Sequence, residues 1–138
     1  MPSYNFSDQI FAELEKRVRE ARDNSLIQCG DKVVELTNNN FRDKSFFGSS
    51  WPANKAGTPI LVKSGLLRTS IRVQSRSTHT VKVGSVGVIY SSIHNYGGVI
   101  RQGNRVITIP QRQYLGAHPR QTAAMLLIIK RNFRNIAR

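Results

Sequence analysis

The stretch SIRVQSRSTHTVKVGSV, residues 70–86, decides the fold class, because it contains two runs in which apolar and polar residues alternate. The first run is Ser70–Ser75 and the second is Thr80–Val86. Alternation with a period of two gives a strand one apolar and one polar face. The sequence therefore predicts two strands joined by a hairpin connection at residues 76–79.

Helical periodicity appears on both sides of this pair of strands. Residues 8–40 carry one apolar stripe at helical spacing, made of Ile10, Phe11, Leu14, Val18 and Ala21, then Leu26, Ile27, Val33, Val34 and Leu36. Weak positions at 23–25 and 29–30 leave two possibilities, two helices or one long helix that bends there. Ser7 is the expected N-cap, and residues 120–136 predict a C-terminal helix.

A long loop is predicted at residues 44–64, which are rich in glycine, serine, proline and asparagine. Loops of this length in a compact domain are commonly functional. Phe46, Phe47 and Trp51 are its apolar anchors. Two readings of these aromatic residues stay open: they pin the loop to the core, or they contact another subunit.

The remaining elements complete the predicted fold. Residues 88–96 suit either a helix or a strand, and a further strand is expected at Val106–Ile109, where Pro110 ends it. The fold class is therefore α+β, with N-terminal helices and a C-terminal helix packed on a small, mainly antiparallel sheet. A long loop and a protruding hairpin are added to this sheet.

The length of 138 residues suits one domain. We expect four parts within it: an acidic helical part (1–43), the long loop (44–64), the sheet (65–116) and a basic C-terminal helix (117–138).

Charge is unevenly distributed along the chain. Twenty-one Lys and Arg residues against eight Asp and Glu residues give a net charge of +13. Residues 1–43 hold all eight acids and six bases, a charge of −2, whereas residues 44–138 hold fifteen bases and no acid. Copies this basic repel one another unless something offsets the field. The offset could be nucleic acid, an acidic partner or the acidic helix of a neighbouring copy; a solvated basic surface is the other reading.

Residue types that carry catalysis or bind metals are sparse. Because no carboxylate follows Asp43, the rest of the chain cannot supply an acid–base pair of carboxylates. His79, His94 and His118 share no metal-ligand spacing with one another or with Cys29, the one cysteine, which fits a buried helical position. The sequence therefore predicts no metal, no cofactor and no enzymatic activity, and no segment is apolar enough for a membrane span.

A basic nucleic-acid-binding module is the main alternative function. Basic residues gather around a predicted hairpin and on the C-terminal helix: Arg101, Arg105, Arg112, Lys130, Arg131 and Arg134. Such residues neutralise phosphates, but the sequence has no helix-turn-helix, zinc-finger or RNP pattern. The expectation is therefore nonspecific proximity to DNA. A hydrolase that uses Ser91 and His94 is a minor third alternative.

Three motifs follow one another between residues 51 and 116. They are Trp51-Pro52 followed by ILVKSGLLRTSI at 60–71, VGS at 83–85 followed by YSSIHNYGG at 90–98, and IPQRQYLG at 109–116. In order and spacing they resemble the phage virion morphogenesis family, also called tail-completion proteins and typified by phage Mu. Ser91 stands where the family has alanine, and Gln113 where it has proline.

The resemblance implies a structural protein of the virion, assembled in the host cytoplasm and located in the tail or neck. Family members act in tail completion at the head-proximal end of the tail, and similar small neck and tail-terminator proteins form hexameric rings. The implied partners are other copies of the chain, the tail tube or sheath, and head-connector proteins. This role fits the absence of a catalytic motif and the separation of charge, which favours head-to-tail packing of copies.

The motifs also supply candidate structural residues: Gly65, Tyr90, His94, Gly97, Gly98, Pro110 and Tyr114. We expect Gly65 to permit a turn, and Gly97 and Gly98 to direct residues 99–105 outward as an arm. His94 is expected to be a hydrogen-bonded structural histidine, and Tyr114 to pack in the core.

The candidate interface residues are the loop aromatics and the basic residues named above: Phe46, Phe47, Trp51, Arg101, Arg105, Arg112, Lys130, Arg131 and Arg134. Arg112 follows the strand that Pro110 ends, so its guanidinium can bind either a carboxylate or a carbonyl. A carboxylate partner would have to come from residues 1–43 or from another chain.

Overall fold

A computed structural model describes residues 1–3, 5–53 and 65–136. Most of the predicted long loop, residues 54–64, lies outside the described residues. The part of that loop that is described, residues 44–53, contains a tight hairpin of two short strands, β1 (Ser45–Phe46) and β2 (Ser49–Ser50).

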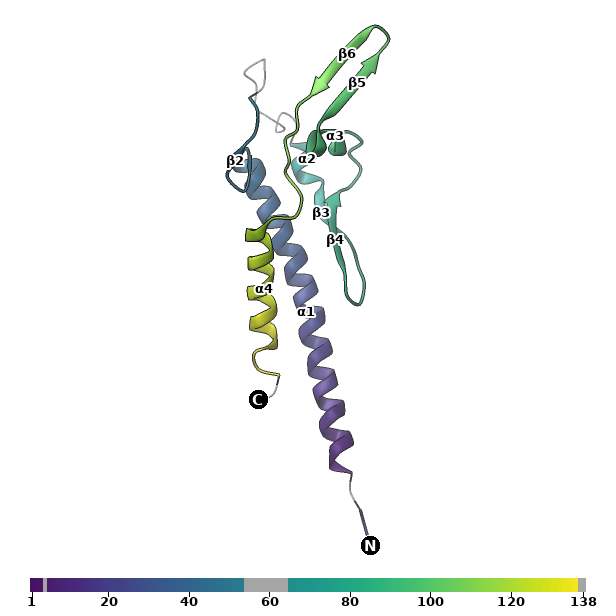
Figure 1. Ribbon diagram of the computed structural model, residues 1–138. Helices are drawn as coiled ribbons and strands as arrows, with labels where there is room; N and C mark the ends of the chain where they lie inside the picture. The colour runs from purple at the N-terminus through teal and green to yellow at the C-terminus, as the bar shows by residue number, and fades with distance from the viewer. Residues whose placement is uncertain (4, 54–64, 137–138) are drawn as a thin grey trace.

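The helix α1, Phe6–Asp43, is a single helix of 38 residues along which the other elements are arranged (Figure 1). The sequence leaves open two helices or one long helix, and the prediction of two separate helices is wrong. The prediction of Ser7 as N-cap is also wrong, because the Oδ1 atom of Asn5 accepts the hydrogen bond from the N–H of Asp8 at 3.4 Å. The helix ends at Lys44, whose left-handed backbone (φ 50°) lets its N–H reach the carbonyls of the last turn.

Gly30 explains why the predicted weak point does not interrupt α1. The strands β3 (Ile71–Arg76) and β4 (Val81–Ser85) lie against the helix here. A Cβ atom on Gly30 would lie 2.8 Å from Cγ2 of Val81 and 3.0 Å from Cγ2 of Val73. The glycine thus allows close contact between helix and hairpin, which offsets its low helix propensity.

The C-terminal helix α4, Pro119–Phe133, packs beside the middle of α1 (Figure 1). Ala21, Ser25 and Cys29 are small buried residues on the facing side of α1, and Ile128 is buried on α4. The amide of Asn132 donates to Oγ of Ser25 at 3.0 Å. Small side chains on one helix let the axis of the other approach closely.

The strands of the described residues form three separate antiparallel hairpins: β1–β2, β3–β4 and β5–β6. The α+β class and the antiparallel pairing are confirmed, and the hairpin predicted from residues 70–86 is β3–β4. The expectation of one small sheet is wrong, because each hairpin stands alone. The strands β5 (Gly98–Gln102) and β6 (Arg105–Ile109) form the protruding hairpin that the sequence predicts, although only the second of these strands was predicted separately, and β6 ends before Pro110 as expected.

Two short helices complete the fold. The helix α2, Leu66–Thr69, follows Gly65, whose φ of 67° lies in the left-handed region. The helix α3, Ser91–Tyr96, shows that the ambiguous segment at residues 88–96 is partly helical. Figure 1 shows the two helices near one another, and Leu67 of α2 belongs to the same core cluster as Phe41 of α1.

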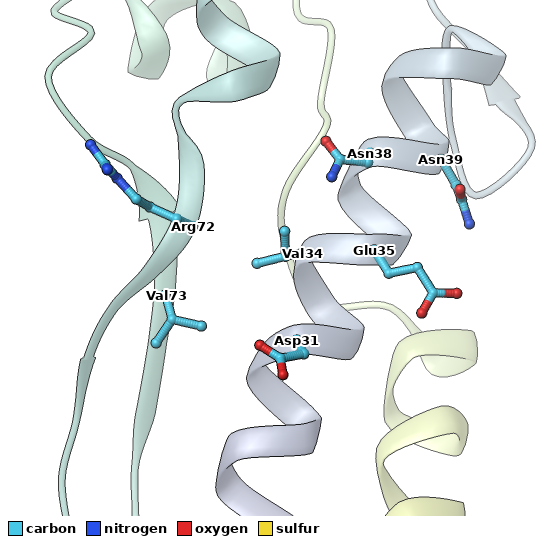
Figure 2. A pocket seen from close by; sticks show the side chains of 7 residues that line it. All are labelled: Asp31, Val34, Glu35, Asn38, Asn39, Arg72 and Val73. Atoms are coloured by element: carbon cyan, nitrogen blue, oxygen red, sulfur yellow. The ribbon is translucent and has the colours of Figure 1, made fainter.

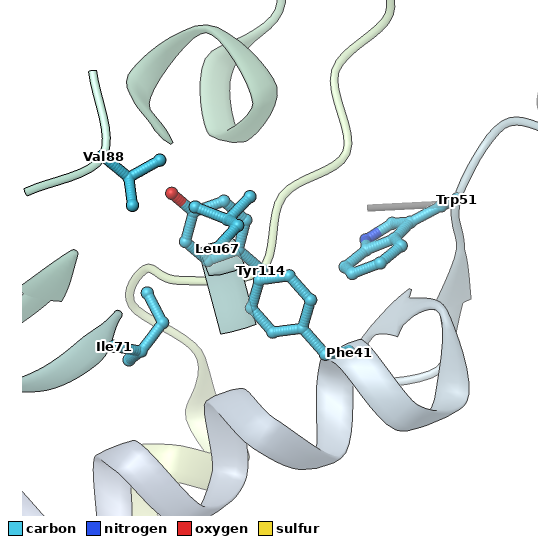
Figure 3. Close-up of a cluster of buried hydrophobic side chains, with 6 residues drawn as sticks. All are labelled: Phe41, Trp51, Leu67, Ile71, Val88 and Tyr114. Atoms are coloured by element: carbon cyan, nitrogen blue, oxygen red, sulfur yellow. The ribbon is translucent and has the colours of Figure 1, made fainter. Parts of the chain in front are cut away.

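The hydrophobic core gathers around that end of α1, and Figure 3 shows its members: Phe41, Trp51, Leu67, Ile71, Val88 and Tyr114. The ring of Phe41 is 0% exposed and lies between those of Trp51 and Tyr114, with centroid distances of 5.6 and 4.9 Å. This core joins α1, α2, β3 and the segment after β6, so it fixes how the elements are arranged.

The apolar stripe predicted on the first helix is only partly buried. Ala21 and Val33 are buried, but Ile10, Phe11, Leu14 and Val18 are exposed. The reason is length: α1 extends beyond the end of α4, so within the described residues the first turns have no element beside them (Figure 1).

Candidate functional site

The third motif, residues 109–116, is the point where most of the other segments meet. Asn95, at the end of α3, is buried, and its Oδ1 accepts hydrogen bonds from the N–H groups of Tyr114 (3.0 Å) and Leu115 (3.1 Å). Its Nδ2 donates to the carbonyl of Leu115 at 3.0 Å. One side chain therefore satisfies three backbone groups and joins the second motif to the third.

Asn40 makes a second connection of this kind. It is buried on α1, and its Nδ2 donates to the carbonyl of Tyr114 while its Oδ1 accepts from the N–H of Phe47, both at 3.0 Å. Neither asparagine was predicted from the sequence as a site residue. The sequence does contain one sign that Asn95 is important, namely its place inside the second motif. For Asn40 the sequence shows only that it belongs to a run of three asparagines.

Arg112 is buried within the fold, only 7% exposed. Its Nε donates to the carbonyl of Pro52 at 3.0 Å and its Nη2 to that of Ala53 at 3.3 Å, so of the two possible partners the structure shows the carbonyls. The indole N–H of Trp51 donates to the carbonyl of Gln113 at 2.7 Å. These bonds join the first motif to the third. Arg112 was a candidate interface residue, but the structure places it in the interior and not on the surface.

The hydrogen bond expected for the His94 side chain is not made through its Nδ1 atom. This atom is buried and has no hydrogen-bond partner among the described residues. Burial, and then the nearby charge of Arg112, lower the pKa of His94 below its ordinary value. The ring packs edge-on against that of Tyr90 at a centroid distance of 5.7 Å, and Tyr90 is 37% exposed, so this pair of motif residues lies near the surface.

The three loop aromatics separate into two groups. Trp51 is buried in the core, which is the pinning role that the sequence left open. Phe46 and Phe47 are half-buried and pack against His118, the residue that caps α4. The ring of Phe47 stacks on His118 at 4.2 Å, and Phe46 meets it edge-on at 5.6 Å. They therefore hold the start of α4 against the β1–β2 hairpin.

The strands β5 and β6 form an arm that projects from the body (Figure 1). At its base, Gly97 has φ 72° and ψ 174°, a backbone region that essentially only glycine adopts. Arg101 and Arg105 lie near the tip and are exposed, as are Val99 and Val106. The structure thus places the two candidate arginines on an uncovered ribbon with apolar side chains beside them.

The candidate basic residues of α4 lie on its exposed side. Lys130, Arg131 and Arg134 are exposed, and Arg131 donates to Oε1 of Gln28 on α1 at 3.2 Å. Leu126 and Leu127 are exposed on the same helix. The outer surface of α4 is thus both basic and apolar.

A shallow groove between α1 and β3 was not foreseen from the sequence (Figure 2). It is lined by Asp31, Val34, Glu35, Asn38 and Asn39 of α1 and by Arg72 and Val73 of β3. Nζ of Lys32 lies 2.9 Å from Oε2 of Glu35. The groove presents carboxylates and carboxamides, groups that bind cationic or hydrogen-bonding side chains.

A search of the described residues finds no group of three or more His, Cys, Asp or Glu side chains placed to hold a metal ion. Within the same residues, every helix is too short or too polar to span a membrane. The sites that the structure does supply are therefore surfaces, namely the arm, the outer side of α4 and the groove.

Comparison with known proteins identifies a family. The model of the phage virion morphogenesis family matches residues 7–134, from the first turn of α1 to just past the end of α4. No curated protein and no solved structure matches the chain. The match includes the α1 and α4 segments, which lie outside the three motifs.

Proposed function

Because the chain belongs to the phage virion morphogenesis family, its role lies in building the virion, and from this premise we propose that it completes the phage tail at the head-proximal end. We further propose that it does so as a ring of identical subunits, hexameric like other small neck and tail-terminator proteins. Its partners would be neighbouring copies, the tail tube or sheath, and the head connector. Its place would be the neck of the virion.

One observation carries this proposal: two uncovered elements project from opposite ends of the molecule. The N-terminal turns of α1 extend beyond α4, and the β5–β6 arm extends past the core (Figure 1). Both carry exposed large apolar side chains, Ile10 and Phe11 on the helix and Val99 and Val106 on the arm. Exposed apolar surface of this kind marks sites of contact with other proteins.

The distribution of charge supports a ring of like subunits. All eight acids lie on α1, whereas residues 44–138 hold fifteen bases and no acid. In a head-to-tail ring, each copy can set its acidic helix against a basic surface of the next copy. The same separation leaves further bases free to face a passing genome.

We also propose that the protein has no catalytic activity. His94 is half-buried, and burial and then the nearby charge of Arg112 lower its pKa. Ser91 accepts, through its backbone carbonyl, a hydrogen bond from the hydroxyl of Tyr114 at 2.8 Å. Nδ1 of His94 has no hydrogen-bond partner among the described residues, so the Ser91 hydroxyl is not paired with it as an activated nucleophile would be, which argues against the hydrolase alternative.

The test of tail completion is a phage that lacks the gene, examined by electron microscopy of lysates. We expect full heads and separate tails, with joining restored when the protein is supplied in trans. Tails that join heads at the normal frequency without the protein would contradict the proposal.

A basic nucleic-acid-binding module is the second candidate function, favoured by the exposed Arg101 and Arg105 on the arm. Binding to duplex DNA at several salt concentrations separates the two functions. Several phosphate contacts would give an affinity that falls steeply with salt. Weak DNA binding beside tight binding to a tail or connector protein would favour tail completion.

A further inference from the structure

The exposed apolar stripe of α1 continues the surface that α4 covers. Ala21, Ser25 and Cys29 face α4, and steps of three and four residues toward the N-terminus lead to Val18, Leu14 and Phe11, with Ile10 beside them. The covered part ends near Arg17, whose Nη1 donates to the carbonyl of Ile136 at 3.2 Å. Beyond this point Ile10 is 64% and Phe11 61% exposed.

We propose that this stripe (Ile10, Phe11, Leu14 and Val18) docks on the outer side of α4 in a neighbouring copy of the same chain. The proposal rests on the ring proposed above and names the contact that would build it. The stripe continues an existing helix–helix contact, so a second α4 can extend the packing of the first along α1.

The outer side of α4 is suited to receive the stripe. Leu127 is 68% exposed and Leu126 is exposed as well, whereas Ile128 on the same helix is buried. Lys130 and Arg134 are exposed beside these leucines and have no carboxylate partner among the residues described. An apolar patch with basic residues along it therefore lies open.

Acidic residues flank the stripe on α1. At helical spacing Glu13 and Glu20 lie along one side of it and Glu15 along the other, and Glu13 already pairs with Nε of Arg17 at 3.2 Å within the helix. All three side chains are exposed. Docking would thus match apolar with apolar surface and carboxylates with the cations of α4.

Charge favours α4 over a second stripe as the occupant. Two stripes packed together would bring Glu13 and Glu20 near the same acids of the other copy, and like charges repel. In an assembly of identical chains, carboxylates for Lys130 and Arg134 can come only from residues 1–43, since no acid follows Asp43. A contact between two different surfaces also generates a ring when its rotation closes.

The test measures the mass of the purified full chain by sedimentation or light scattering over a range of concentrations. The stripe variant carries Ile10→Ser and Leu14→Ser, and the α4 variant carries Leu126→Ser and Leu127→Ser. Each is expected to weaken self-association about tenfold or more, because each deletes apolar surface that the contact buries. The control is Ile89→Ser, between β4 and α3, which is 100% exposed and belongs to neither surface, so this variant should assemble like the parent.

Mixing the two variants identifies the partner surface. Each retains the surface that the other has lost, so we expect one-to-one dimers that grow no further. The double charge reversal Lys130→Glu with Arg134→Glu should weaken association, and adding Glu13→Lys with Glu20→Lys should restore it. Helical content measured by circular dichroism shows that each variant still folds.

Several outcomes would overturn the proposal. A parent chain that stays monomeric at every concentration would do so, as would a stripe variant that assembles like the parent. An α4 variant that still forms dimers through intact stripes would assign the contact to two α1 helices instead. Binding of the stripe to a different phage protein, with no self-association, would assign it to that partner.

Failure of the contact and failure of the proposed function remain distinguishable. If the variants abolish association but a phage lacking the gene still joins tails to heads, the contact stands and tail completion fails. If joining needs the protein but the stripe variant assembles and complements normally, tail completion stands and the contact fails.

Discussion

The side-chain oxygen of Asn95 accepts hydrogen bonds from the backbone of Tyr114 at 3.0 Å and from the residue after it at 3.1 Å. This bond joins the end of α3, from which the arm starts, to the segment by which the arm returns. The hydroxyl of Tyr114 in turn donates to the carbonyl of Ser91 at 2.8 Å. Hydrogen bonds therefore fix the arm to the core both where it begins and where it returns. Its tip is the part that is free for contact.

Replacing Asn95 by alanine should lower the free energy of unfolding by about 3 kcal/mol, because it leaves buried N–H groups of Tyr114 and Leu115 without a partner. Chemical denaturation measures this change. Asn104→Ala, at the exposed turn of the arm, is the matched control and should change stability by less than about 0.5 kcal/mol. Equal losses in the two variants would show that the Asn95 bonds are not important to the fold.

Gly97→Ala should destabilise more than Gly103→Ala. Both glycines have positive φ, 72° and 57°, but Gly97 also has ψ 174°, so backbone strain is up to about 3 kcal/mol in Gly97→Ala and about 1–2 kcal/mol in Gly103→Ala. At Gly97 the new Cβ would also lie 2.9 Å from the backbone nitrogen of Gln111, whereas at Gly103 nothing lies within 4 Å. The difference in melting temperature between the two variants measures the extra backbone strain and the clash together, and no difference would mean that the base of the arm adjusts freely.

Much of this fold could be predicted because its signals are local. The alternation in residues 70–86 and the helical periodicity around it depend only on neighbours in sequence, and both elements are present. The match of the family model to residues 7–134 likewise confirms the resemblance that the three motifs indicated. The strand β5 carried no alternation, because Val99 and Arg101 lie on an arm that is exposed.

The features that sequence analysis missed depend on tertiary structure. The stripe at Ile10 and Leu14 has the same pattern as a buried one, and only the shorter length of α4 leaves it exposed. Asn40 and Asn95 resemble ordinary loop or helix-end asparagines until the fold brings the third motif beside them. The cap at Asn5 differs from the expected Ser7 by two residues, a typical uncertainty for helix ends.

Stability should fall as the pH drops below about 6.5, the ordinary histidine pKa. Burial and Arg112 lower the pKa of His94 in the folded chain, so the unfolded chain binds the proton first and acid favours unfolding. The stabilisation that comes from neutral His94 is complete above the pKa of this histidine in the unfolded chain. It is lost as the pH falls toward the lower pKa of His94 in the folded chain. Between pH 7.5 and 5, the free energy of unfolding should therefore depend less steeply on pH in His94→Gln than in the parent.

The control for this pH dependence is His79→Gln, at an exposed position in the turn between β3 and β4. It should retain the slope of the parent. A His94→Gln variant with the full slope would assign the dependence to other groups.

Replacing Phe41 by alanine should cost about 3–5 kcal/mol, because its ring is 0% exposed between Trp51 and Tyr114. Phe11→Ala removes the same side chain from an exposed position on the same helix. It should leave the stability of the monomer nearly unchanged when measured at low protein concentration. Comparable losses at the two positions would mean that the N-terminal turns of α1 are covered in the free chain.

The thiol of Cys29 reports on the contact between α1 and α4. It is buried, its Sγ lies 3.9 Å from the carbonyl of Met125, and burial raises its pKa, so little thiolate forms at neutral pH. Alkylation by iodoacetamide should therefore be slow in the folded chain and fast in denaturant.

Ile128→Ala, which removes a buried side chain of α4, should raise the alkylation rate about tenfold or more, since it weakens this contact by about 2–4 kcal/mol. Ile129→Ala, at the exposed neighbouring position, is the control and should react like the parent. A native thiol that reacts as fast as the denatured one would show that α4 does not stay packed on α1.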